Sequence, residues 1–155
     1  SFDLMDNFEN EVLIVIYDKD KNYLSHAESE KLIPRSFLGH ITDNEIILEE
    51  LPLDSSNTRM FPSAIGKGVV VYYDYSQKDV FSYRTLDLKS SIFSEKIEIK
   101  IKGISNYIGE YFFNKENSLI ITISKGESYS DDAVLLINLL DGKVQSKLRK
   151  ELEGK

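Results

Sequence analysis

The stretch from Ser118 to Gly142 limits the possible folds of this chain more than any other. It contains two apolar runs rich in β-branched residues, Leu119 to Ile123 and Ala133 to Leu140, on either side of a polar loop. It ends at Asp141-Gly142, a dipeptide typical of tight turns. Because short runs of this kind favour paired β-strands, we expect a long buried hairpin here.

Two patterns, continuous apolar runs and strict alternation, predict further strands. The run EVLIVIY at 11–17 is expected to form a central strand that is buried on both faces. The segment KIEIKIK at 96–102 alternates apolar and charged residues, which predicts a half-exposed strand with Ile97, Ile99 and Ile101 pointing inward. The remaining strands are expected at 45–51, 69–75 and 80–88, and residues 1–11 fit either an edge strand or a helical turn.

The fold class expected from these strands is all-β, with one β-rich domain over residues 1–155. A chain of this length commonly folds as one domain with its own core. The strands would form antiparallel hairpins arranged as a meander, a curled sheet, a sandwich or an open propeller-like stack. At the C-terminus, Val144, Leu148 and Leu152 recur every four residues, as in a short amphipathic helix over 143–153, and a final strand over 143–148 is the alternative.

Three segments repeat the order buried strand, polar turn, strand, and they begin at Leu13, Val69 and Leu119. The first two are followed by an alternating strand, EIILEEL and KIEIKIK, and the third continues into INLLDGKV. This order resembles the blade unit of a β-propeller, and INLLDGKV resembles the turn between the third and fourth strands of WD-type blades. The resemblance implies a fragment or open stack that assembles with further blades, because three such units do not close a ring. The chain has no Trp and hence no Trp-Asp signature, and a single meander of similar hairpins is the alternative.

The composition excludes several classes of protein. The chain has no cysteine, which rules out a disulfide framework, a thiolate metal site and a thiol nucleophile. It has no apolar run of about 18 residues, the length that a membrane-spanning helix needs. Its first residues, SFDLMDNFENE, are acidic, whereas a secretory signal peptide begins with a basic segment. We therefore expect a soluble cytoplasmic protein with no membrane partner.

The net charge of −7 is concentrated in the first part of the chain. Residues 1–60 carry 13 acidic and 5 basic side chains, a net of −8, whereas residues 61–155 carry 13 and 14, a net of +1. Direct binding of nucleic acid is disfavoured, because phosphate binding needs a basic surface. The acidic segment favours a basic protein partner, and the alternative is that it serves solubility alone.

The residue types that carry catalysis or bind cofactors form no recognisable motif. The sequence has no Gly-x-Ser-x-Gly, no HExxH and neither of the glycine-rich phosphate-binding patterns. Asp18, Asp20 and Asn22 match the first three ligand positions of an EF-hand loop, but the positions that need Gly and Glu hold other residues. We therefore predict no metal, no cofactor and no enzymatic activity. A hydrolase that uses His40 with a nearby carboxylate is retained as an alternative.

A small, acidic, cysteine-free chain without catalytic motifs is similar in profile to bacterial immunity proteins, which bind and neutralise toxins that are often basic nucleases. The resemblance implies a non-catalytic protein-binding domain whose acidic N-terminal third meets a basic partner. Acidic side chains there would steer association and imitate the charge of phosphate groups. The residues expected to contact the partner are Asp18, Asp20, Glu28, Glu30, Glu45, Glu49 and Glu50. The alternative function is a propeller-like structural scaffold that assembles with other blades.

Overall fold

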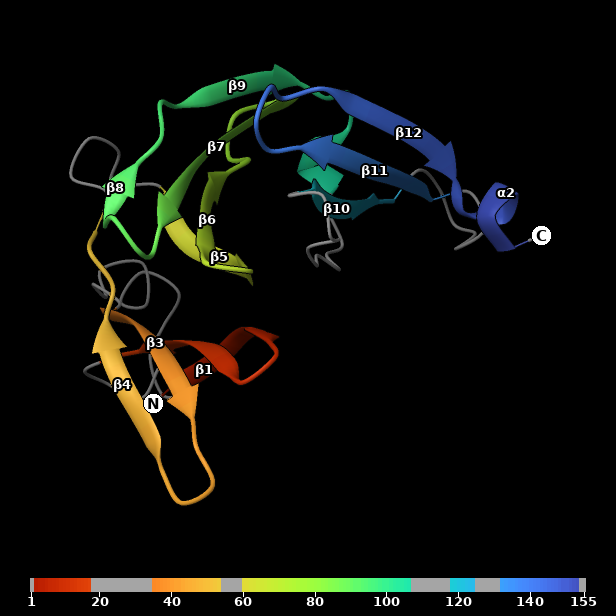
Figure 1. Ribbon diagram of the computed structural model, residues 1–155. Helices are drawn as coiled ribbons and strands as arrows, with labels where there is room; N and C mark the ends of the chain where they lie inside the picture. The colour runs from red at the N-terminus through yellow and green to blue at the C-terminus, as the bar shows by residue number, and fades with distance from the viewer. Residues whose placement is uncertain (1, 18–34, 54–59, 107–117, 125–131, 154–155) are drawn as a thin grey trace.

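The computed structural model describes residues 2–17, 35–53, 60–106, 118–124 and 132–153. In these ranges the chain is mostly β-structure, and it folds into three antiparallel sheets, named A, B and C below (Figure 1). The predicted all-β fold class is therefore confirmed. No helix in these ranges is long and apolar enough to cross a membrane.

Each sheet is built from strands that follow one another along the chain. Sheet A contains, in spatial order, β1 (Phe2–Phe8), β2 (Glu11–Ile16), β3 (Arg35–Ile41) and β4 (Ile46–Glu50). Sheet B contains β5 (Phe61–Gly66), β6 (Val69–Asp74) and β7 (Val80–Asp87), and both β8 (Ile92–Phe93) and β9 (Ile97–Lys100) pair with β7. Sheet C contains β10 (Ser118–Ile123), β11 (Ala133–Asn138) and β12 (Val144–Leu148). The described strands thus form three successive meanders.

Most local predictions hold. The hairpin expected between Ser118 and Gly142 is confirmed, because β10 and β11 pair along their whole length. The alternating strand is confirmed as β9, which is shorter than predicted; Ile97 and Ile99 pack against the core between sheets B and C, and Ile101, just beyond β9, lies within it. The chain then enters a short 3-10 helix, η2 (Ile104–Asn106). The turn expected after Leu13 to Tyr17 lies outside the described residues.

The C-terminal segment contains both predicted alternatives, one after the other. Strand β12 pairs with β11 through Leu148, and the short helix α2 (Arg149–Glu153) begins at the next residue. The Glu151 carboxylate accepts a hydrogen bond from Leu148 N at 3.0 Å, which stabilises the junction. The four-residue apolar spacing therefore predicted the helix correctly only for its second half.

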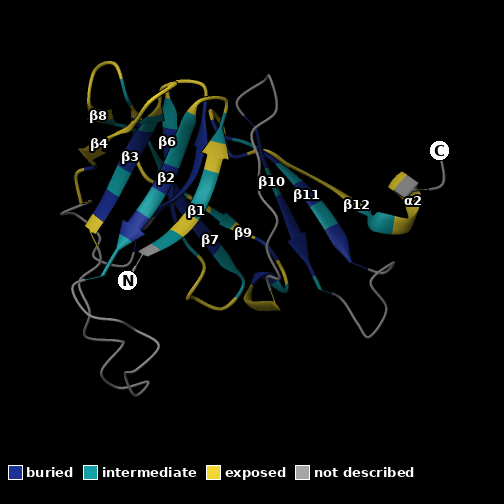
Figure 2. Cartoon of the chain, turned by 90° about the horizontal axis from the view of Figure 1, so that it is seen from below, coloured by how far each residue is buried: buried dark blue, intermediate teal, exposed yellow. Residues whose placement is uncertain are grey.

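Sheet B lies between sheets A and C, and a separate apolar core fills each gap. The alternation of side chains along β6 makes this possible: Val70 and Tyr72 pack toward sheet A, whereas Val71 and Tyr73 pack toward sheet C. Both faces of β6 are therefore buried, which accounts for its continuous apolar sequence. In Figure 2 buried residues follow the strands, and exposed residues mark β4 and much of β12.

Hydrogen bonds also join the region of sheet A to sheet B. The Tyr72 hydroxyl donates to Pro52 O at 2.7 Å, just beyond the end of β4. Ile65 N donates to the Asp6 carboxylate at 2.8 Å, from β5 to β1. Burial raises the pKa of Asp6 above its ordinary value, although this hydrogen bond acts in the opposite direction.

Strand β2 departs from its prediction in one respect. It is a central strand, between β1 and β3, as expected, but the predicted burial of both its faces is wrong. Leu13 and Val15 are buried, whereas Val12, Ile14 and Ile16 are only partly covered. The reason is that sheet A packs against a neighbouring sheet on one side only in the described part of the chain (Figure 1).

Candidate functional site

The face of sheet A that is turned away from sheet B carries a continuous set of apolar side chains. Residues directly opposite each other in a sheet share a face, so the strand registers identify the members. This outer face of sheet A contains Leu4, Val12, Ile14, Ile16, Phe37, Gly39, Ile41, Ile46 and Leu48. Leu4 is 62% exposed, Ile46 54% and Leu48 47%. Contiguous exposed apolar side chains on a soluble domain commonly mark an interaction site.

Gly39 makes the apolar surface continuous across β3. A Cβ at this position would lie 2.7 Å from Val12 Cγ2, 3.0 Å from Ile46 Cγ2 and 3.3 Å from Leu48 Cδ2. Side chains of β2 and β4 therefore close over the glycine from both sides. The absence of a side chain at Gly39 lets three apolar groups meet on the outer face.

Strand β4 forms one edge of sheet A and, among the described strands, pairs with β3 alone. Leu51 N, just beyond β4, donates to Ser36 O of β3 at 2.8 Å. In an antiparallel pair alternate residues bond to the neighbouring strand. The backbone N–H and C=O groups of Ile46, Leu48 and Glu50 therefore point away from β3, toward the free edge.

The structure separates the acidic residues that were predicted to bind a partner. Asp18, Asp20, Glu28 and Glu30 lie outside the described residues. Glu45 lies in the exposed turn between β3 and β4, and Glu49 and Glu50 lie on opposite faces of β4, as their adjacent positions predicted. These three side chains border the β3–β4 hairpin but do not form one cluster.

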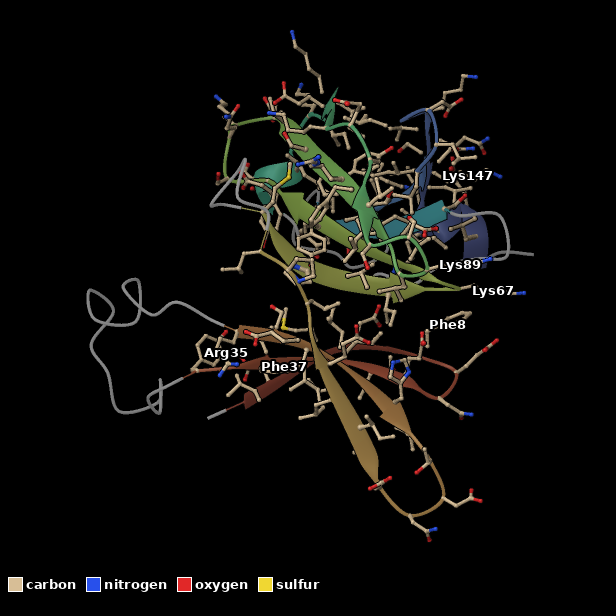
Figure 3. All side chains as sticks on the ribbon, turned by 60° about the vertical axis from the view of Figure 1, so that its left-hand side comes forward. Phe8, Arg35, Phe37, Lys67, Lys89 and Lys147 are labelled. Carbon is tan, nitrogen blue, oxygen red and sulfur yellow. The ribbon has the colours of Figure 1, made fainter. Side chains whose placement is uncertain are left out.

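Glu50 is held by an ion pair at one end of the outer face. The Arg35 guanidinium donates two hydrogen bonds to its carboxylate, at 2.8 Å from Nε and 2.6 Å from Nη2. This contact lowers the pKa of Glu50 below its ordinary value. The same guanidinium lies 5.2 Å from the ring centroid of Phe37, and Figure 3 shows the two side chains together on the sheet. Glu50 is therefore partly neutralised by Arg35.

Sheet A and its turns carry most of the negative charge of the described chain. Residues 2–17 and 35–53 contain eight acidic side chains and one basic side chain, Arg35, which gives a net of −7. Residues 60–106, which include sheet B, contain seven basic and five acidic side chains, a net of +2. The acidic property expected of the N-terminal third is thus a property of sheet A and its turns. Asp6, Glu11 and Glu49 lie on the face toward sheet B, and Glu45 lies in the turn between β3 and β4.

A second candidate lies on the other face of sheet A, where two adjacent hollows of about 420 and 310 Å³ open toward sheet B. Glu11 and His40 line both, Lys67 lines the larger and Lys89 the smaller. His40 Nδ1 lies 3.4 Å from the Glu11 carboxylate, so the fold does bring this histidine to a carboxylate. Ser91 lines the smaller hollow together with His40 and Glu11, and among the described residues no hydroxyl group hydrogen-bonds to His40.

Metal binding has no support in the described ranges, where no three His, Asp or Glu side chains gather closely enough to hold an ion.

Comparison with family models, with curated proteins and with solved structures returned no match. The function must therefore be inferred from the surface of the molecule itself. The outer face of sheet A was missed by the sequence analysis, although EVLIVIY carried the signal: its apolar residues occupy both faces of a strand that has one buried face.

Proposed function

We propose that this chain is a non-catalytic protein-binding domain that binds a basic protein through the outer face of sheet A. The observation that carries the proposal is the composition of β2. Its outward residues Val12, Ile14 and Ile16 are those of a strand buried on both faces, yet they are only partly covered. A bound protein would complete their burial.

The net charge of sheet A supports a basic partner. Protein interfaces commonly have an apolar centre and a polar border. Here the apolar centre lies in a sheet with a net charge of −7 over its described residues, so a partner with basic groups around an apolar patch would be attracted. An inhibitor that neutralises a basic toxin, as immunity proteins do, fits this chemistry. Glu45 and Glu49 would then contribute to steering.

The test is affinity capture from a lysate of the source organism at low and high salt, with the captured protein then purified and its affinity measured. We compare the wild type with Leu4→Lys, which places a cation on the outer face, and with Ile92→Lys as a matched control. Leu4 is 62% exposed on sheet A and Ile92 is 65% exposed on sheet B. We expect a basic protein whose affinity falls at high salt, and falls at least about tenfold for Leu4→Lys but not for Ile92→Lys. Equal binding to all three proteins would overturn the proposal.

A second function is favoured by a specific observation, the regular stacking of the three sheets. Sheets A, B and C each follow chain order and pack face to face, so another sheet of the same kind could cover the outer face of sheet A. The chain would then be a propeller-like scaffold that assembles with further blades. This function predicts concentration-dependent self-association, which Leu4→Lys weakens. Light scattering that finds a strict monomer up to high concentration would exclude assembly with copies of this chain.

A further inference from the structure

We propose that the partner joins sheet A by β-strand addition, with an extended segment of apolar and basic residues lying along β4 as a fifth strand. This inference rests on the proposed function, because it specifies how the same surface holds its partner. Sheet A ends at β4 among the described strands, so one side of that strand is open. The backbone groups of Ile46, Leu48 and Glu50 face this open side.

The first three residues of strand β4 lack the features that usually protect an edge, and its only charges are Glu49 and Glu50 at the far end. Sheet edges are commonly blocked by lysine, proline, a bulge or short length, because unpaired backbone groups attract other chains. Ile46, Ile47 and Leu48 are consecutive apolar residues near half exposure, with no lysine or proline among them. The register of β4 on β3 is regular throughout, without a bulge.

Two other edges provide a contrast, whereas β10, an edge of sheet C, also lacks lysine, proline and a bulge but has mostly buried side chains. β1, at the opposite edge of sheet A, has a register shift between Leu4 and Asp6. β12, at the edge of sheet C, exposes the polar side chains of Gln145, Ser146 and Lys147. β4 thus combines an unblocked edge with exposed apolar side chains, which suits an added strand.

The charge of the hairpin identifies the occupant. Residues 35–53 carry four acidic side chains and one arginine, a net of −3, so an incoming strand with basic residues is attracted. On the outer face the strand would meet Ile46 and Leu48 with apolar side chains, and on the other face it would meet Glu49 with a basic one. Two copies of β4 would bring two hairpins of the same negative sign together, which disfavours self-pairing. The occupant is therefore a segment of a basic protein.

The test begins with a probe of defined chemistry. Random peptides of about nine residues, long enough to form one strand, are displayed on phage and selected on the immobilised full chain. Counter-selection uses Leu48→Pro, which removes an outward N–H while every hydrogen bond to β3 is kept. Proline is tolerated at such edge positions. Ser146→Pro on β12 is the matched control. Lys143 O accepts a hydrogen bond from Asn138 N of β11, and bonding residues alternate along a strand, so the N–H of Ser146 also points away from β11.

We expect enriched peptides that alternate apolar and basic residues, bind Ser146→Pro as they bind the wild type, and lose at least about tenfold in affinity for Leu48→Pro. Circular dichroism and thermal unfolding establish that both variants are folded. No enrichment, or equal binding to both variants, would overturn the inference.

A second measurement separates backbone pairing from side-chain contact. Peptides are synthesised with N-methyl groups at one or the other set of alternate residues, because only one set of N–H groups faces β4 in an added strand. Methylation of the residues whose N–H groups face β4 should abolish binding, and methylation of the other residues should preserve it. Equal effects of the two methylation patterns would overturn strand addition.

The protein partner distinguishes this inference from the proposed function. If Leu4→Lys weakens binding of the partner and Leu48→Pro does not, the proposed binding at the outer face stands and strand addition alone is wrong. Dimerisation that Leu48→Pro abolishes would overturn the choice of a basic occupant in favour of a second copy.

Discussion

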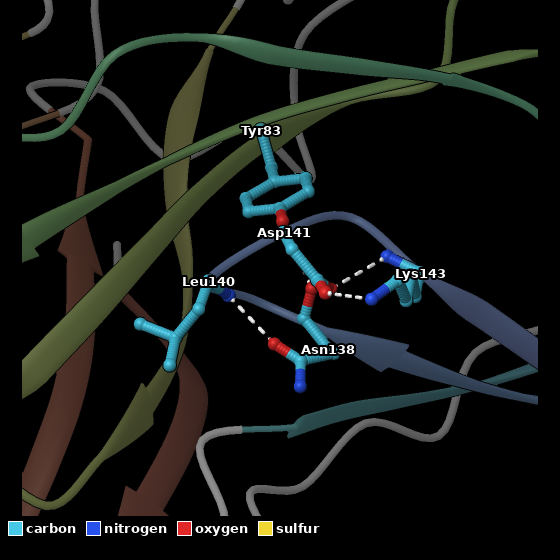
Figure 4. A network of polar contacts seen from close by, with 5 residues as sticks. All are labelled: Tyr83, Asn138, Leu140, Asp141 and Lys143. Carbon is cyan, nitrogen blue, oxygen red and sulfur yellow. Dashed lines mark hydrogen bonds and ion pairs between the residues drawn. The ribbon is translucent and has the colours of Figure 1, made fainter.

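Replacing Tyr83 by Phe tests how sheets B and C are joined. Tyr83 is completely buried on β7, and it points toward Asn138 at the end of β11 (Figure 4). Its hydroxyl proton is shared between Leu139 O at 2.9 Å and Asn138 O at 3.2 Å. Asn138 O also accepts from Gly142 N at 2.9 Å, so it keeps a partner in Tyr83→Phe. Leu139 O loses this donor. The loss of a buried hydrogen bond of this kind costs about 1 to 2 kcal/mol of the free energy of unfolding at neutral pH.

The same hydroxyl makes the cost depend on pH. Burial, together with the nearby Asp141 carboxylate, raises the pKa of Tyr83 from 10.0 to about 12. A group whose pKa is raised in the folded protein contributes stability that is complete below its unfolded pKa and lost as the pH rises through its folded pKa. The relevant window is therefore about pH 10 to about pH 12. At about 1.4 kcal/mol per pKa unit, the wild type loses up to about 3 kcal/mol across that window relative to the variant.

The assay is urea unfolding followed by circular dichroism, for the wild type and Tyr83→Phe, at intervals from about pH 7 to about pH 11.5. We expect the wild type to be more stable up to about pH 9, and the difference to shrink and then reverse above about pH 10. Two pH profiles that stay parallel over the whole range would refute the argument from burial. A difference below about 0.5 kcal/mol at neutral pH would show that the Leu139 carbonyl finds another donor.

Two further predictions concern sheet A. Gly39→Ala places a Cβ 2.7 Å from Val12 Cγ2. Because the valine side chain has few rotamers, we expect the free energy of unfolding, measured in urea, to fall by about 1 to 3 kcal/mol. An unchanged urea midpoint would contradict the close approach. Asp6→Asn keeps an oxygen that can accept from Ile65 N but removes the titration. Because burial raises the pKa of Asp6 above 3.8, the wild type should gain stability relative to the variant as the pH falls from neutral through the folded pKa, and a constant difference would contradict this.

The strands themselves were predictable because strand formation follows local patterns. The alternation at 96–102 and the paired apolar runs between Ser118 and Gly142 identified β9, β10 and β11. Adjacent strand residues point to opposite faces wherever the strand lies, so the separation of Glu49 and Glu50 was also predictable. The contact between Glu50 and Arg35 was not, because it depends on the register of β4 on β3, which sequence spacing does not specify.

The candidate site, too, was only partly predictable from the sequence. The sequence by itself determined that the chain is all-β and that its negative charge gathers in the first third, because side-chain periodicity and charge are properties of the chain. EVLIVIY and VVVYYDY look alike, and only the tertiary structure decided that β6 is covered on both faces and β2 on one. Coverage depends on which sheets stack, and among the described strands sheet B lies between two neighbouring sheets while sheet A has one. The register of β2 on β3 brought His40 to Glu11, and among the described residues the stacking leaves the outer face of sheet A and the edge of β4 exposed.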